Sequence, residues 1–171
     1  MIVGHDWGAL VAWHAALLRP DRFRAVIGLS VPFRPRGPVR PTTAMPQNEE
    51  SQFYQLYYQM PGVAEAELER DVRDTFLRVL YSSSEDAPRI EQASTTDNRT
   101  NSLMVPRNDS YVSRKPKPTS LPPWLTEADI DFFTMEFTRT GFRGELNWYR
   151  NIDRNWELGG NRRVIGRWCS V

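Results

Sequence analysis

The sequence predicts an α/β fold in which one strand-helix-strand unit precedes a mostly helical region. Three observations support this prediction. The apolar run of residues 1–3 ends at a glycine-containing turn, as a strand does, and apolar residues then recur every three or four positions over residues 10–18, the period of an amphipathic helix. The uninterrupted apolar stretch 25–29 within residues 23–30 is typical of a strand buried on both faces of a parallel sheet. A right-handed crossover would make the two strands parallel neighbours.

Composition divides the rest of the chain into segments. Residues 1–31 hold the strand-helix-strand unit, and five prolines make residues 32–47 a semi-rigid connector rather than a regular element. Residues 48–158 carry helical patterns and are predicted to form a second, helical domain. The tail, residues 159–171, shows no clear period and is rich in arginine.

The helical domain is predicted to contain three main helices and one long loop. Apolar spacing predicts a helix over residues 68–81, and the polar, proline-containing residues 82–123 are expected to form a surface loop. Thr126 and Asp129 have the spacing of a capping box at the start of a second helix, which ends at a glycine. A last helix is expected over residues 144–156.

Composition excludes several classes of function. The 171 residues include 22 basic and 21 acidic side chains, a net charge of +1 that gives no footprint for nucleic acid or an anionic membrane. A single cysteine, Cys169, and two histidines, His5 and His14, cannot form a disulfide or a structural zinc site. The sequence lacks a signal peptide and an apolar run long enough to span a membrane, so a cytoplasmic location is expected.

The turn after the first strand carries a candidate catalytic motif, Gly4-His5-Asp6-Trp7-Gly8. A strand that runs into Gly-x-Asp-x-Gly and then into a helix is the arrangement of a nucleophile elbow, with aspartate in the central position usually held by serine. The central residue is expected to have a strained backbone, and both glycines to be required because strand and helix pass close together. The alternative is a tight turn in which Asp6 only caps the helix.

Several segments of the chain closely resemble epoxide hydrolases of the soluble type, which have the α/β-hydrolase fold. The resemblance extends over residues 1 to about 158 and is looser in the loop 82–120. It implies a partial α/β-hydrolase core followed by a helical cap, or lid, domain. The segments that carry it are residues 4–10, 19–22, 29–33, 53–69 and 140–151.

The resemblance implies a role for four residues. Asp6 would be the nucleophile that opens an epoxide ring, a carboxylate being suited to form an ester that water can later cleave. Tyr149 would be the proton donor and Tyr54 the second hydrogen-bond donor to the epoxide oxygen. The backbone N–H of Trp7 would supply half of the oxyanion hole for ester hydrolysis. The substrate would be a small apolar epoxide, and no cofactor or metal is implied.

The chain also departs from the family pattern. Neither His5 nor His14 matches the family's general base, and that histidine and its acidic partner are missing. Residues 159–171 depart from the family pattern, so a truncated or frame-altered product with doubtful turnover is expected. Two alternatives stay open: a haloalkane dehalogenase-like hydrolase, which also uses an aspartate nucleophile, and a non-catalytic remnant or cap-type binding module. The sequence does not specify an oligomeric state.

Overall fold

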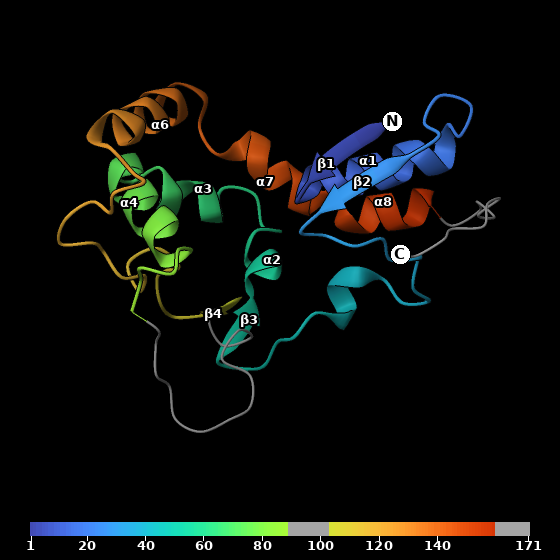
Figure 1. Ribbon diagram of the computed structural model, residues 1–171. Coiled ribbons are helices and arrows are strands. Elements are labelled where there is room, and N and C mark those ends of the chain that lie inside the picture. Colours follow the sequence, from blue (N-terminus) through green and yellow to red (C-terminus); the bar gives the residue numbers. More distant parts are fainter. Residues whose placement is uncertain (89–102, 160–171) are drawn as a thin grey trace. The chain divides into compact units, whose positions relative to one another are not determined.

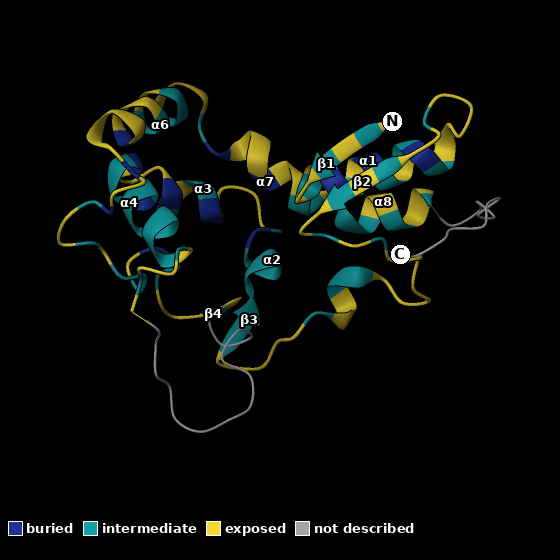
Figure 2. Cartoon of the chain, viewed as in Figure 1, coloured by how far each residue is buried: buried dark blue, intermediate teal, exposed yellow. Residues whose placement is uncertain are grey.

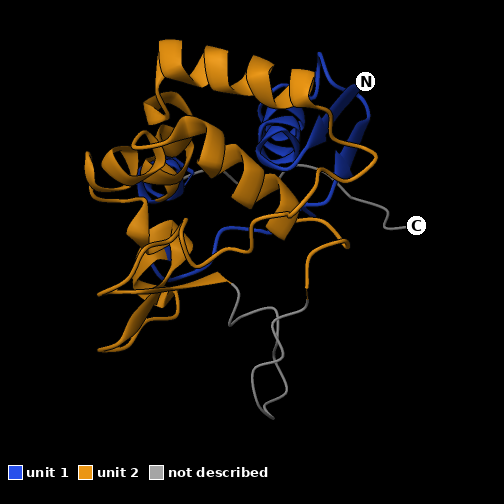
Figure 3. Ribbon diagram, turned by 90° about the vertical axis from the view of Figure 1, so that its left-hand side faces the viewer, with its two compact units in different colours: residues 1–41, 153–171 blue, residues 42–152 orange. Residues whose placement is uncertain are grey.

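The computed structural model describes residues 1–88 and 103–159 of the chain (Figure 1). These residues form two compact units, distinguished by colour in Figure 3. Unit 1 comprises residues 1–41 together with the segment that starts at Asp153, and unit 2 comprises Thr42–Ile152. The finer domain boundaries expected from composition stay predictions, and Cys169 with nearly all of the tail lies outside the described residues.

Unit 1 is built on a strand-helix-strand arrangement. Strand β1 (Ile2–His5) leads through Asp6 into helix α1 (Trp7–Leu18), and strand β2 (Val26–Leu29) follows. The two strands are parallel and in register. This confirms the predicted parallel pair, and helix α1 ends at Leu18, the last residue of the predicted apolar period.

Helix α1 approaches the sheet closely because small side chains form its buried face. The fully buried positions of the helix are Ala9, Ala12 and Ala16, whereas Val11 and Leu18 are exposed. A face of alanines lets the helix backbone lie against the strands, and a wider side chain would hold it away.

The second strand is not buried on both faces, contrary to the prediction. Side chains of successive strand residues alternate between faces, and Val3, Ile27 and Leu29 lie on the face opposite to Gly4 and Gly28. The three apolar side chains are 54%, 45% and 50% exposed, respectively. Figure 2 colours both strands by burial, with teal for intermediate and yellow for exposed positions. Among the described residues, α1 packs against one face of the pair, and the apolar side chains of the other face stay about half exposed.

The proline-rich connector is held by helix α8 (Ile152–Leu158). The Arg36 guanidinium lies 3.7 Å from the ring centroid of Trp156 and donates to the Trp156 carbonyl at 2.8 Å. The indole Nε1 of Trp156 donates in turn to the Gly37 carbonyl at 2.8 Å. The connector was expected to contain no regular element, but residues Pro41–Ala44 form a short 3-10 helix, η1, which proline at its first position allows.

Unit 2 contains an unexpected strand pair. Strand β3 (Ser51–Phe53) pairs in antiparallel register with strand β4 (Met104–Pro106), which lies within the segment expected to be a surface loop. Val105 and Val112 of that segment are buried. The polar composition of residues 82–123 gave no indication that these two valines are buried. Their strand partner and packing neighbours lie far away in the sequence.

Two of the predicted helices are interrupted. The helix predicted over residues 68–81 is interrupted near its start: α3 (Val63–Leu68) ends at Leu68, and α4 (Val72–Ser82) begins after Asp71, whose carboxylate accepts the N–H of Asp74 at 2.9 Å. The last is divided into α7 (Arg143–Arg150) and α8, and between them the Asn151 side chain donates to the Asn147 carbonyl at 2.8 Å.

The remaining helix of unit 2, α6 (Glu127–Thr140), follows the prediction. Thr126 accepts the N–H of Asp129 at 3.2 Å, the Asp129 carboxylate accepts the N–H of Thr126 at 2.9 Å, and Gly141 ends the helix with a positive φ of 69°. Helix α2 (Tyr54–Tyr57) completes the unit, whose core gathers side chains from α2, α3, α4 and α7. The buried members are Tyr58, Ala64, Leu68, Val72, Val112, Phe142 and Leu146.

Candidate active site

Asp6 lies in the turn between β1 and α1 with a backbone conformation that non-glycine residues rarely adopt. Its φ is 51° and its ψ is −120°. The N–H of Asp6 donates to the Leu29 carbonyl at 3.1 Å, and its carbonyl accepts the N–H of Ala9 at 3.0 Å. The backbone is thus fixed on one side by β2 and on the other by the first turn of α1, and this constraint holds Asp6 in the strained conformation.

The same residue also makes a capping contact. An Oδ2 atom of Asp6 accepts the N–H of Trp7 at 2.7 Å. An ordinary capping aspartate has an extended backbone and reaches an N–H two or three residues onward, and Asp6 does neither. The N–H that the resemblance implies as an oxyanion donor is therefore hydrogen-bonded to the carboxylate of Asp6 itself.

The two glycines of the motif differ in their surroundings. A Cβ atom on Gly4 would lie 2.0 Å from the Gly8 carbonyl oxygen, so the strand and helix leave no room for a side chain there. A Cβ atom on Gly8 would meet nothing within 4 Å among the described residues. The expectation that both glycines are required holds for Gly4, while in the described part of the chain nothing crowds Gly8.

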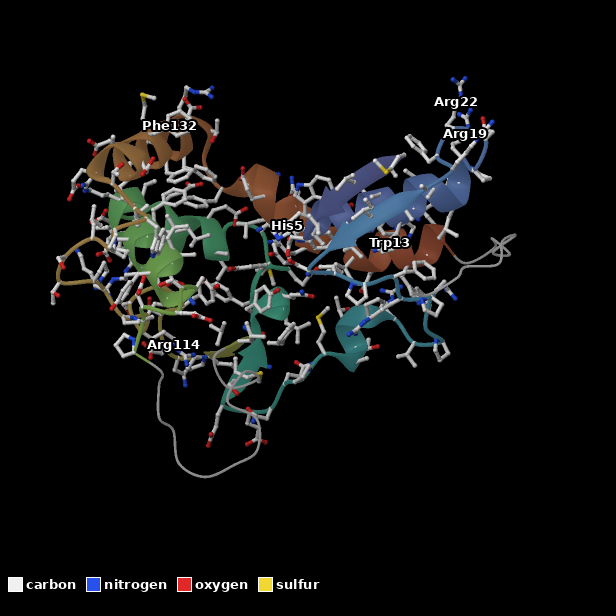
Figure 4. All side chains as sticks on the ribbon, viewed as in Figure 1. His5, Trp13, Arg19, Arg22, Arg114 and Phe132 are labelled. Atoms are coloured by element: carbon white, nitrogen blue, oxygen red, sulfur yellow. The ribbon has the colours of Figure 1, made fainter. Side chains whose placement is uncertain are left out.

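The two histidines lie in unit 1. His5 ends β1 and is exposed, and its position is labelled in Figure 4 with that of Trp13. The ring of His14 makes a hydrogen bond from Nδ1 to the Leu10 carbonyl at 2.8 Å, one turn back along α1. The indole Nε1 of Trp13 donates to the Val31 carbonyl at 3.0 Å and fixes α1 to the chain beyond β2.

Unit 2 brings Tyr54 and Tyr149 together. Tyr54 starts α2 and Tyr149 lies near the end of α7, yet their ring centroids are 5.7 Å apart in an edge-to-face contact. The amide of Gln55 donates to the Tyr54 hydroxyl at 3.0 Å. Both tyrosines are half-buried, so they are neither sealed in the core nor fully in solvent. Two phenols this close can direct hydrogen bonds to one oxygen atom.

Tyr58 is also part of this arrangement, and it was not among the predicted site residues. Its ring lies 5.5 Å from that of Tyr54 and 5.0 Å from that of Tyr149, both edge-to-face. Burial, followed by the proximity of Tyr111, raises the pKa of Tyr58, so its hydroxyl stays protonated. Its position four residues after Tyr54 in an aromatic segment was the signal that could have revealed it.

A half-buried carboxylate supports this aromatic cluster. Glu67 accepts hydrogen bonds from the hydroxyls of Tyr57 and Ser110, and from the N–H of Val112 at 2.8 Å. Burial opposes its ionisation, but these hydrogen bonds outweigh burial and lower the pKa of Glu67. Glu67 thereby fixes residues 110–112, including Tyr111, against α3.

Asp6 belongs to unit 1, and Tyr54, Tyr58 and Tyr149 belong to unit 2. Among residues 1–88 and 103–159, no three His, Cys, Asp or Glu side chains are arranged to hold a metal ion. In the same part of the chain, no helix has the length and apolar character needed to cross a membrane.

Comparison with known proteins identifies relatives of this arrangement. Residues 1–113 match the model of the α/β hydrolase fold family. Epoxide hydrolase A of Mycobacterium tuberculosis is 46% identical over 99% of the chain, and bifunctional epoxide hydrolase 2 of Sus scrofa is 41% identical over 93%. The chain covers 50% and 26% of these two proteins, so it spans half or less of each one's length.

Solved structures agree with the sequence relatives. Epoxide hydrolase A of Mycobacterium thermoresistibile matches 92% of the chain with 48% identity and a TM-score of 0.75. An epoxide hydrolase from an endophytic Streptomyces matches 95% with 43% identity and a TM-score of 0.80. In each case the match covers 47% of the solved chain.

Proposed function

Because this chain belongs to the α/β hydrolase fold family, we propose that it carries the ester-forming half of an epoxide hydrolase. Asp6 is the nucleophile, Tyr149 the proton donor and Tyr54 the second donor to the epoxide oxygen. The observation that carries the proposal is the strained backbone of Asp6 between β1 and α1. Such strain persists only where the surrounding structure imposes it, and it is concentrated at catalytic positions.

Formation of the ester needs only the epoxide, the carboxylate of Asp6 and the two tyrosine hydroxyls. A carboxylate oxygen of Asp6 attacks a ring carbon of the epoxide, and the bond from that carbon to the ring oxygen breaks. The electron pair of that bond remains on the oxygen, which takes the proton of Tyr149 while it accepts a hydrogen bond from Tyr54. The product is a hydroxyalkyl ester of Asp6, and Tyr149 regains its proton from solvent.

Completion of the cycle needs a base that activates water against the ester. His14 is engaged with the Leu10 carbonyl, and His5 lies one residue before the nucleophile, so we assign neither as that base. In the full reaction, water would cleave the ester to a vicinal diol, with the Trp7 N–H as one oxyanion donor. A small apolar epoxide as substrate and a cytoplasmic location stay predictions.

The tyrosine pair favours an epoxide over an alkyl halide. Ring opening leaves the oxygen attached to the substrate as a developing alkoxide, which needs hydrogen-bond donors and a proton. Tyr54 and Tyr149, with ring centroids 5.7 Å apart, are two neighbouring donors of the kind that this oxygen requires. A departing halide needs no proton, so chloride release that survives the Tyr54→Phe plus Tyr149→Phe double substitution would assign the chain to the dehalogenases instead.

The proposal is tested by incubation with styrene oxide, followed by mass spectrometry of the digested chain. We expect a hydroxyalkyl ester on the peptide that contains Asp6, absent from Asp6→Asn and retained in the matched surface control Asp21→Asn. Tyr149→Phe is expected to slow ester formation by about 10- to 100-fold. A folded sample that yields neither ester nor diol contradicts the proposal and favours a non-catalytic module.

A further inference from the structure

Arg150, which follows Tyr149 in α7, is paired with Glu65 of α3 in a nearly buried ion pair. The guanidinium donates through Nη1 to Oε1 at 2.6 Å and through Nη2 to Oε2 at 2.8 Å, so both carboxylate oxygens are engaged. The two side chains are only 11% and 13% exposed. A two-pronged contact of this kind restricts orientation as well as distance.

Both partners of the pair are also bound to the chain between α2 and α3. The Nε of Arg150 donates to the Tyr58 carbonyl at 3.0 Å, and Oε2 of Glu65 accepts the N–H of Gly62 at 2.9 Å. The side chain of Gln59 adds a third link, because its Nε2 donates to the Tyr149 carbonyl at 3.0 Å. Helix α7 is thus attached to the segment that carries the other tyrosines through the Tyr149 carbonyl and the Arg150 side chain.

The Tyr149 ring lies one residue before this anchored position. Its edge-to-face contacts with Tyr54 and Tyr58 require α7 to lie close to the segment that Arg150 and Gln59 contact. A misplacement of about 1 Å in a catalytic group can slow a reaction by about 100-fold. We propose that Arg150 and Glu65 form a positioning pair that holds Tyr149 beside Tyr54, so that both phenols reach the epoxide oxygen.

Another ion pair of unit 2 provides a contrast. Arg73 of α4 pairs with Glu127 and Asp131 of α6, but Arg73 is 40% exposed and both carboxylates are more so. These residues link two helices that carry none of the proposed site residues. Arg73→Ala is therefore a matched control in which an arginine of the same unit loses two carboxylate partners.

The inference rests on the proposed function, and its test is a double-substitution cycle. The rate of Asp6 ester formation from styrene oxide is measured as a function of epoxide concentration in single turnover. Arg150→Ala is expected to lower the maximal rate by about tenfold with little change in the half-saturating concentration, because orientation is lost rather than binding. Arg150→Lys should restore part of the rate, and Arg73→Ala should stay within about twofold of the parent chain.

The decisive comparison is made in the Tyr149→Phe background, where Tyr54 still supplies one donor. If Arg150 acts through Tyr149, Arg150→Ala adds less than about twofold to the effect of Tyr149→Phe. Equal effects of Arg150→Ala in both backgrounds would mean that the pair only stabilises the fold, and would overturn the inference. An unchanged rate in Arg150→Ala alone would do the same.

A second readout does not depend on activity. Proton NMR of the chain with labelled tyrosines reports contacts between the rings of Tyr149 and Tyr58, and Tyr→Phe variants assign them. The contacts should weaken in Arg150→Ala and persist in Arg73→Ala, and their persistence in both would refute the positioning pair. If the parent chain forms no ester, the proposed function fails, while the ring contacts still decide whether the pair places Tyr149.

Discussion

At the scale of single residues, Asp6 combines a reactive carboxylate with a backbone that a side chain disfavours. Its φ of 51° and ψ of −120° lie in a region that glycine occupies readily and other residues do not. The fold keeps this conformation because β2 and α1 hold the backbone on both sides. The strained backbone lowers the stability of the fold, and it holds the Asp6 carboxylate in place.

This strain predicts the effect of replacing Asp6. Asp6→Gly should raise the free energy of unfolding by about 1 kcal/mol, since glycine adopts the same backbone without penalty, and should abolish ester formation. Both variants lose the hydrogen bond from Trp7, but Asp6→Ala keeps the strain, so it should be less stable than the glycine variant by a similar amount. Urea unfolding followed by circular dichroism measures both. An alanine variant as stable as the glycine variant would contradict the strain.

The two motif glycines allow a matched test of crowding. Gly4→Ala should lower the free energy of unfolding by about 2 to 4 kcal/mol, because its Cβ would lie 2.0 Å from a backbone oxygen that cannot move aside. Gly8→Ala should be neutral or stabilising by up to about 1 kcal/mol, since Gly8 lies in the first turn of a helix with open space around it. Equal losses in the two variants, measured by urea unfolding, would refute this difference.

At the scale of elements, the contact between α7 and α3 depends on ionised Glu65. The hydrogen bonds from Arg150 lower the pKa of Glu65 from 4.5 to about 2. Because the folded chain binds this proton less readily than the unfolded chain, the pair contributes its full stability above pH 4.5. That contribution is lost as the pH falls from 4.5 towards about 2.

Glu65→Gln isolates this contribution. The variant should be less stable than the parent chain by about 2 kcal/mol at pH 7, and the difference should shrink as the pH falls below 4.5. Glu136→Gln removes the carboxylate that pairs with the exposed Arg139 and should change stability little at any pH. Unfolding free energies at several pH values test both variants, and a difference for Glu65→Gln that does not depend on pH would rule out the linkage.

At the scale of the whole molecule, the two units differ in what they bury. The buried apolar side chains of unit 1 in the described residues are alanines of α1, and apolar residues of its sheet are exposed. Unit 2 buries larger side chains, including Ile130, Leu68 and Leu146. Burial of larger apolar side chains contributes more free energy, about 1.5 to 3 kcal/mol for each.

This difference predicts unequal local stability. Backbone amides of β1, β2 and α1 should exchange hydrogen faster than those of α4 and α6, because unit 1 opens at a lower free energy. Hydrogen exchange followed by mass spectrometry gives the comparison within one sample. Ile130→Ala should accelerate exchange in unit 2 and leave unit 1 unchanged, and equal protection of the two units in the parent chain would contradict the prediction.

The sequence was sufficient to predict turns, caps and helix ends that depend on residues only a few positions apart. The turn around Asp6, the capping box of Thr126 and Asp129 and the end of α1 depend on side chains that contact their own neighbouring backbone. Tyr54 and Tyr149 have no such local signal, because a tyrosine in an aromatic segment is usually a packing residue. They could be predicted as site residues only from the family resemblance.

What the sequence by itself determined is the α/β class, the strained turn at Asp6 and the starts and ends of several helices. Only the tertiary structure decided which faces are buried, that β4 pairs with β3, that Tyr58 contacts both site tyrosines and that Arg150 reaches Glu65. The physical reason is distance along the chain. Arg150 and Glu65 are 85 positions apart, and a contact of that kind depends on how the intervening elements pack.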